Sequence, residues 1–143
     1  TGIRQVADRL EGARRAVSEV PDADLEVIEM ASLTVLQGRA AAGRLLNRDV
    51  RPDAVFAAND LLAVGVLQAF ALLGGVRVPD EIAVIGYDDI DFAAATVVPL
   101  SSIRQPAALL GYTAVDLLLR GSGEADRHVK FQPELVVRAS TVG

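Results

Sequence analysis

Ala54-Val-Phe-Ala-Ala58 and Ile82-Ala-Val-Ile-Gly86 are two short apolar runs that contain no charged residue. Runs of this length and composition are typical of parallel β-strands that are buried on both faces of a sheet. Between them, Leu61 to Leu73 has the length of a helix, and Gly74-Gly75 is a pair that ends helices. A strand, a helix and a second strand in this order predict an α/β fold with a mostly parallel sheet.

The same alternation of helix and strand continues on both sides of this unit, which predicts a doubly wound sheet. Apolar positions three and four residues apart predict the helices, and short apolar runs predict the strands. Upstream, the predicted elements are a helix over residues 3–19, a strand over Leu25–Met30, and a helix from Ser32 or Thr34 to about Arg48 with Leu36, Ala40, Gly43 and Leu46 inward. Downstream, they are an extended segment over Ser101–Gln105, a helix from Pro106 to Arg120, a linker over 121–126, and a last strand over about Val129–Arg138, which Pro133 kinks or confines to an edge.

The predicted helix Leu61–Leu73 is apolar nearly all round, with Gln68 as its main polar residue. A helix that covers one face of a sheet needs only one apolar stripe, so the rest of its surface must be buried elsewhere. It is either sandwiched inside a larger domain or part of a subunit interface. In so short a chain, the interface is the favoured interpretation.

Composition excludes several classes of function. The 143 residues include 14 Lys+Arg and 19 Asp+Glu, which gives a net charge of −5. This negative charge argues against direct binding of nucleic acid by this segment. With 51% apolar residues the chain can build a core, and no apolar run is long enough to span a membrane. There is no cysteine and only one histidine, His128, so disulfides, thiolate zinc sites and multi-histidine metal sites are not expected.

Two of the predicted strands end in residues suited to binding a polyol: Asn59-Asp60 follows the first, and Tyr87-Asp88-Asp89 follows the second. In an open parallel sheet, ligands bind beyond the carboxyl ends of the strands. An amide donates and accepts, and a carboxylate can accept from two hydroxyls at once. Each group also has a structural alternative, because Asp60 can be a helix N-cap and the paired acids can be a solvated turn. Arg9, in the first helix, is either a bidentate clamp on adjacent hydroxyls or a solvated surface residue.

An enzyme would need groups that this sequence does not supply. A phosphate-accepting receiver domain needs a lysine near its acidic cluster, whereas the only lysine here is Lys130, inside the last predicted strand. No glycine-rich phosphate loop or dinucleotide motif is present. The sequence therefore predicts a binding protein without enzymatic activity, cofactor or metal.

From Arg9 to the end, the order of motifs closely resembles the LacI/GalR family of bacterial transcriptional regulators. The set of motifs in one order is far more specific than any one of them. The motifs that carry the resemblance are Arg9-Leu-Glu-Gly-Ala13, Arg51-Pro-Asp-Ala-Val-Phe-Ala-Ala-Asn-Asp60, Leu72-Leu-Gly-Gly-Val-Arg-Val-Pro-Asp-Glu81, Ile82-Ala-Val-Ile-Gly-Tyr-Asp-Asp89, Pro99-Leu-Ser-Ser-Ile-Arg-Gln-Pro106, Gly111-Tyr-Thr-Ala-Val-Asp-Leu-Leu-Leu119 and Pro133-Glu-Leu-Val-Val-Arg-Ala-Ser-Thr141.

The resemblance implies a periplasmic-binding-protein-like core of two α/β lobes, with a ligand cleft between them and a DNA-binding headpiece ahead of them. Position by position, it implies that the ligand contacts are Arg9, Asn59, Asp88 and Gln105, with Gln5 where relatives often carry a small hydroxyl residue and Leu33 where several carry an aromatic. It also implies a dimer interface that includes Leu67, Phe70, Leu73 and Val76. Ala13 stands where the family usually has an aromatic residue.

The resemblance further divides the chain into three parts. Residues 1–104 match the C-terminal lobe without its first strand, residues 105–121 match a crossover helix that packs on the other lobe, and residues 122–143 match a linker and a final strand. The missing strand is central in a doubly wound sheet, so a gap is expected between two strands of this chain. We expect a fragment that compensates by dimerising or by exchanging elements with a neighbour.

The function implied by the resemblance is ligand sensing in a cytoplasmic, homodimeric regulator. A small polar effector, a sugar or a nucleoside, would close the two lobes and change the DNA affinity of a headpiece that lies outside this chain. The alternative is a periplasmic sugar-binding protein of a transport system, which a secretion signal upstream would support. An upstream helix-turn-helix would exclude that alternative.

Overall fold

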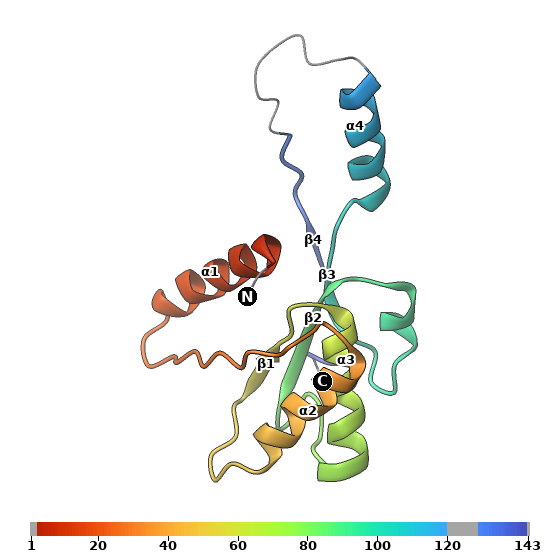
Figure 1. Ribbon diagram of the computed structural model, residues 1–143. Helices are drawn as coiled ribbons and strands as arrows, with labels where there is room; N and C mark the ends of the chain where they lie inside the picture. Colours follow the sequence, from red (N-terminus) through yellow and green to blue (C-terminus); the bar gives the residue numbers. More distant parts are fainter. Residues whose placement is uncertain (1–2, 120–128, 143) are drawn as a thin grey trace.

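The computed structural model describes residues 3–119 and 129–142 of the chain (Figure 1). The elements confirm an α/β fold and follow the predicted order, apart from the strand expected at Leu25–Met30. They are α1 (Arg4–Ser18), α2 (Val35–Leu46), β1 (Ala54–Phe56), α3 (Asp60–Ala69), the π-helical turn η1 (Phe70–Gly74), β2 (Ala83–Asp88), the 3-10 turn η2 (Asp91–Ala95), β3 (Ser101–Arg104), α4 (Ala107–Leu119) and β4 (Glu134–Val136). Thr34 caps α2 by accepting a hydrogen bond from the Gln37 N–H, and the α3–η1 helix ends at Gly75, where φ is 55°.

The four strands form one mostly parallel sheet in the order β1-β2-β3-β4. β1, β2 and β3 run parallel, with Val55 beside Val84 and Ile85 beside Ser101. β4 runs antiparallel to β3 and forms one edge of the sheet, directly after Pro133. The last strand is shorter than predicted, since only residues 134–136 pair, in line with the absence of a donor N–H at proline.

Helix α3 is sandwiched between α2 and the sheet, so most of its apolar surface is buried within the chain itself. The side chains of Leu67, Phe70 and Val76 are 5%, 0% and 8% exposed because they fill the chain's own core. Of the four predicted interface residues, only Leu73 is exposed. It lies with Leu72 at the end of η1, where the core no longer covers the chain.

Small residues let α2 and α3 approach closely. A methyl group on Gly38 would overlap the Leu62 carbonyl oxygen, and one on Gly65 would overlap the Val35 carbonyl oxygen. The buried residues of α2 are Gly38, Ala42 and Leu45, a different face of the helix from the one predicted with Leu36, Ala40, Gly43 and Leu46 inward. Leu36, predicted to face inward, is 72% exposed, because the side of α2 that contacts α3 carries Gly38 and not Leu36.

The segment Leu25–Met30 does not form the predicted strand. No described strand lies beside it to accept its backbone hydrogen bonds, and the structure records no backbone pairing between it and β1. Instead, an apolar cavity of about 280 Å³ lies between this segment and residues 54–58, with Val6 and Leu10 of α1 also in its wall. This cavity corresponds to the gap expected between two strands of the sheet.

Because of the same gap, residues of β1 are more exposed to solvent than predicted. Phe56 is 42% exposed and Ala54 is also exposed, whereas Val84 on the neighbouring β2 is fully buried. β1 pairs only with β2, so its other edge faces the cavity. Within α1, which Figure 1 shows set apart from the sheet, Val6 is the one buried residue.

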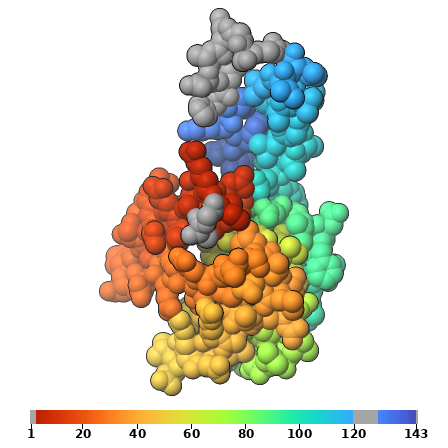
Figure 2. Space-filling model, in the orientation of Figure 1, coloured from red at the N-terminus to blue at the C-terminus, as the bar shows by residue number. Residues whose placement is uncertain are grey.

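Helix α4 projects from the body that the other elements form (Figure 2). It has no buried residue, and its apolar side chains Tyr112 and Leu118 are 68% and 79% exposed. That residues 105–121 pack on a lobe outside this chain stays a prediction. His128 and the linker predicted over 121–126 lie outside the described residues.

Candidate ligand-binding site

Asp88, at the carboxyl end of β2, is the centre of a polar cluster. Its Oδ1 atom accepts a hydrogen bond of 2.7 Å from Gln105 Nε2 and lies 3.6 Å from Arg9 Nη2. The side chain is 35% exposed, so a ligand can reach the carboxylate. The structure thus brings together three of the predicted ligand contacts from α1, β2 and the segment after β3.

Arg9 reaches this cluster from α1 across the ends of two strands. Its guanidinium lies 3.6 Å above the centroid of the Tyr87 ring and donates a 2.5 Å hydrogen bond to the Ala58 carbonyl. A cation over an aromatic face and a charge-assisted hydrogen bond both hold the group in one orientation. Arg9 is therefore preorganised beside Asp88 rather than free in solvent, and its side chain is only 12% exposed.

Asn59, also predicted as a ligand contact, has a structural role in the fold. Its Oδ1 accepts a hydrogen bond of 3.0 Å from the Leu62 N–H, which caps α3, and its Nδ2 donates to the Leu33 carbonyl. The capping role considered for Asp60 therefore belongs to Asn59. One Nδ2 hydrogen remains available to a ligand, because an amide nitrogen has two to donate.

The other two predicted contacts lie outside the cluster. Gln5 is exposed on α1, and the structure records no polar contact between it and the described cluster residues. Leu33 packs against the core and lines the apolar cavity beside Arg9. Both stay predictions as ligand contacts.

Asp60 is fully buried and acts as an internal brace. Its Oδ1 accepts from Ser102 Oγ at 2.6 Å, and its Oδ2 accepts from the Ile90 N–H at 2.9 Å. Burial raises the pKa of the Asp60 carboxyl, and these two hydrogen bonds offset the increase only in part. Gly86 leaves the room for this carboxylate, since a methyl group there would overlap Asp60 Oδ1.

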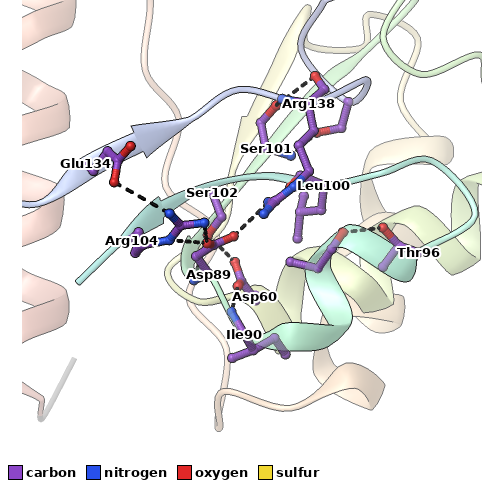
Figure 3. A network of polar contacts seen from close by, with 12 residues as sticks. Asp60, Asp89, Ile90, Thr96, Leu100, Ser101, Ser102, Arg104, Glu134 and Arg138 are labelled. Carbon is purple, nitrogen blue, oxygen red and sulfur yellow. Dashed lines mark hydrogen bonds and ion pairs between the residues drawn. The ribbon is translucent and has the colours of Figure 1, made fainter. Parts of the chain in front are cut away.

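Asp89 lies in a second polar network, with Arg104 and Arg138 (Figure 3). Its Oδ2 accepts a 2.7 Å hydrogen bond from Arg104 Nε, and its Oδ1 lies 2.7 Å from Arg138 Nη1. Burial raises the pKa of the Asp89 carboxyl, but the two arginines lower it by more, so the net pKa is below its usual value. Asp89 is therefore neither the solvated turn residue considered from the sequence nor a free ligand contact.

Four residues around the site were not predicted from the sequence: Tyr87, Ser102, Arg104 and Arg138. Two of them are next to predicted contacts, Tyr87 beside Asp88 and Arg104 beside Gln105, and that adjacency is the signal that could have found them. Arg138 carries no such signal, because it is far from Asp89 in the sequence and meets it only through the pairing of β3 with β4.

The arrangement is built for binding. It offers a carboxylate, a guanidinium and one amide around one point, a set that suits a ligand with several hydroxyl groups. Within residues 3–119 and 129–142, no cluster of three or more His, Asp or Glu side chains could hold a metal ion. Over the same ranges, no helix has the length and apolar character needed to cross a bilayer.

Comparisons with known proteins agree with this geometry. Residues 3–141 match the family described as "Periplasmic binding protein-like domain". Over 139 residues the chain is 36% identical to the HTH-type transcriptional regulator DegA of Bacillus subtilis, covering 94% of this chain and 40% of that protein. Over 115 residues it is 43% identical to the ribose operon repressor of Escherichia coli, covering 78% of this chain and 34% of that protein.

Solved structures show the same relationship. A LacI family transcriptional regulator from Lactobacillus casei with bound glucose superposes with a TM-score of 0.66 at 39% identity, over 76% of this chain and 40% of that one. The lac repressor dimer bound to operator and an anti-inducer superposes with a TM-score of 0.83 at 30% identity, over 94% of this chain and 47% of that one.

The chain spans less than half the length of these relatives, so it corresponds to part of them. The family match, however, covers nearly all of its residues. The fold, the motif order and the polar cluster at the strand ends all agree with that match. This chain belongs to the periplasmic-binding-protein-like family, as part of the effector-binding core of a LacI/GalR-type transcriptional regulator.

Proposed function

We propose that this chain is the ligand-sensing part of a DNA-binding regulator, and that it binds a sugar or a nucleoside at the Asp88 cluster. The observation that carries the proposal is the convergence of Arg9, Asp88 and Gln105 on one accessible point at the ends of the strands. The described residues offer hydrogen-bonding groups there and no nucleophile–base pair, which favours recognition over catalysis.

The position of Gln105 suggests how binding is communicated. Gln105 holds Asp88 and stands between β3 and α4, the helix that projects from the body. A ligand that engages Asp88 therefore also meets the start of the crossover segment. In a two-state regulator, such differential contacts shift the equilibrium between lobe arrangements and so change DNA affinity.

A cytoplasmic regulator is favoured over a periplasmic transport protein because the named relatives are operon repressors and transcriptional regulators. Two of them also support the ligand class: one is named for the ribose operon, and one structure contains glucose.

The ligand class can be tested by thermal shift with glucose, ribose, sucrose and adenosine, using the protein expressed from its whole gene. A ligand at about one hundred times its Kd adds about 2.7 kcal/mol of stability, which raises Tm by several degrees. We expect at least one of these compounds to do so. If none shifts Tm at millimolar concentration, the proposed ligand class is wrong.

We further propose that the protein is a homodimer whose interface includes the exposed end of η1. Leu72 and Leu73 are 70% and 67% exposed there, next to the buried core residue Phe70. Adjacent exposed leucines at a helix end are suited to pairing with the same surface of a second copy.

Replacing Leu73 with aspartate is expected to give a monomer by light scattering, because a charge buried in an apolar interface is costly. The free energy of unfolding of the monomer should change little, since Leu73 lies outside the core. Leu36→Asp, at a residue with 72% exposure on α2, is the matched control and should leave the dimer intact. A Leu73→Asp protein that remains dimeric at the parent's concentration would exclude this interface.

A further inference from the structure

The direction in which α4 leaves the body depends on two short strands. β3 leads into α4, and β4 returns from it, so both crossings of the chain lie side by side as an antiparallel pair. Helix α4 has no buried residue that would hold it against the body by itself. The geometry of β3 and β4 therefore determines the direction in which α4 leaves the body.

Asp89 contacts both of these crossings. Its carboxylate binds Arg104 at the end of β3 and Arg138 just beyond β4, at 2.7 Å in each case (Figure 3). Its backbone N–H also donates a 3.0 Å hydrogen bond to Ser102 Oγ, in the middle of β3. With 4% of its side chain exposed, Asp89 is shielded from solvent, which strengthens both ion pairs.

The arginines extend this network on either side. Arg138 also donates a 2.6 Å hydrogen bond to the Leu100 carbonyl, and Arg104 lies 3.6 Å from Glu134 on β4. Glu134 is 69% exposed, so its ion pair with Arg104 is at the solvent-facing rim, where such pairs contribute little. The buried centre of the network is Asp89.

The turn that carries Asp89 also carries Asp88, and its backbone is strained. Asp88 and Asp89 have φ values of 107° and 51°, in a region that non-glycine residues rarely occupy. Such a conformation persists only where the surroundings hold it. The contacts of Asp89 hold the turn on the side of the crossing strands, and those of Asp88 hold it on the side of Arg9.

We propose that Asp89 is a positioning residue which, through Arg104 and Arg138, fixes both crossing strands to the turn that presents Asp88 and so sets the orientation of α4. The inference goes beyond the proposed function, because it concerns the geometry of the crossing and holds for any ligand or none. Asp89 itself does not contact a ligand.

The orientation of α4 can be measured directly with two spin labels. The sequence has no cysteine, so Leu36→Cys on α2 and Leu118→Cys on α4, at residues 72% and 79% exposed, provide unique attachment points. Electron paramagnetic resonance then gives the distribution of distances between the body and α4 in the otherwise unchanged chain. Asp89→Asn, which keeps the shape but removes the charge, is expected to lose the single narrow maximum of the parent.

Glu134→Gln is the matched control, because it removes a carboxylate from the same network at its exposed rim. It should retain the parent's distribution. Equal distributions in Asp89→Asn and the parent would overturn the proposal. If circular dichroism shows that Asp89→Asn is unfolded, Arg104→Gln replaces it as the test variant, because the Arg104 side chain is 48% exposed. A broadened distance distribution in Arg104→Gln would support the proposal, and an unchanged one would overturn it.

The pH dependence gives a second readout that a purely structural role would not produce. The charged groups that act on the Asp89 carboxylate are Arg104 and Arg138, which stay charged; the acids nearby are Asp60, which also interacts with Asp88, and Glu134, which is linked through Arg104. Because the folded pKa of Asp89 is lowered, its ion pairs persist at neutral pH and are lost as pH falls through that value. The parent's distance distribution should broaden over that acid range, whereas that of Asp89→Asn should already be broad at pH 7. A parent distribution that stays narrow while Asp89 becomes protonated would contradict the proposal.

Discussion

Gly38→Ala is expected to lower the free energy of unfolding by about 1–3 kcal/mol, as overpacking in a close-packed interior does. The added methyl group would overlap the Leu62 carbonyl oxygen and lie 3.0 Å from Leu62 Cα, both of which belong to the backbone of α3. Backbone atoms cannot rotate away as a side chain can, so the two helices must separate. Their separation would weaken the whole α2–α3 layer that covers the sheet.

Gly43→Ala is the matched control on the same helix. A methyl group at Gly43 meets no atom within 4 Å, so the substitution gains only the helix propensity of alanine. It should stabilise the chain by about 0.5–1 kcal/mol. Urea unfolding followed by circular dichroism measures both variants. If Gly38→Ala is as stable as Gly43→Ala, the close approach of α2 to α3 is wrong.

The parts of the fold that sequence patterns predicted well are those with a local cause. β2 forms where five apolar residues follow one another, with Val84 and Gly86 buried, and α2 begins where Thr34 can cap it. The glycine pair after Leu73 ends the helix by providing a positive φ. Each of these needs only residues that are neighbours in the sequence.

The errors arose where distant residues decide the outcome. The burial of Leu67 and Phe70 depends on how closely α2 lies on α3, which Gly38 and Gly65 determine. The sequence pattern of α3 records only that it is apolar, and does not reveal whether a second copy or another helix covers it. Leu25–Met30 has the composition of a strand, but a strand also needs a partner for its backbone.

The residues of the candidate site also divide into those with a signal in the sequence and those without one. The strand-end rule singled out Asp88 and Asn59, the chemistry of arginine singled out Arg9, and only the resemblance to a family singled out Gln105. The structure brings Arg9, Asp88 and Gln105 together. The different partners of Asp88 and Asp89 could not be predicted, since adjacent acids have identical chemistry. Their backbone conformation and the positions of Arg9, Arg104 and Arg138 distinguish them.

Asp88→Ala is expected to abolish most of the ligand affinity of the protein. Hydrogen bonds to a charged group contribute about 1.5–3 kcal/mol each, so losing even one of them lowers affinity by about 10- to 150-fold. The loss also removes the partner of Gln105 Nε2 and the charge next to Arg9. Both groups would then turn to water or to other acceptors, and the ligand would meet a disordered site.

Stability should be affected much less than affinity, because Asp88 is 35% exposed and lies outside the core. Asp80→Ala removes the same charge from an exposed surface position, where the carboxylate is 65% exposed and pairs only with Arg77 among the described contacts. It should bind ligand as the parent does. Circular dichroism would establish that both variants are folded before affinities are compared.

The most direct test is isothermal titration calorimetry of the parent, Asp88→Ala and Asp80→Ala with whichever of glucose, ribose, sucrose and adenosine raises the parent's Tm. The proposed site predicts heat and a defined Kd for the parent and Asp80→Ala, and little or no binding for Asp88→Ala. A folded Asp88→Ala protein that binds the same compound with the parent's affinity would contradict the assignment of the Asp88 cluster as the sensing site.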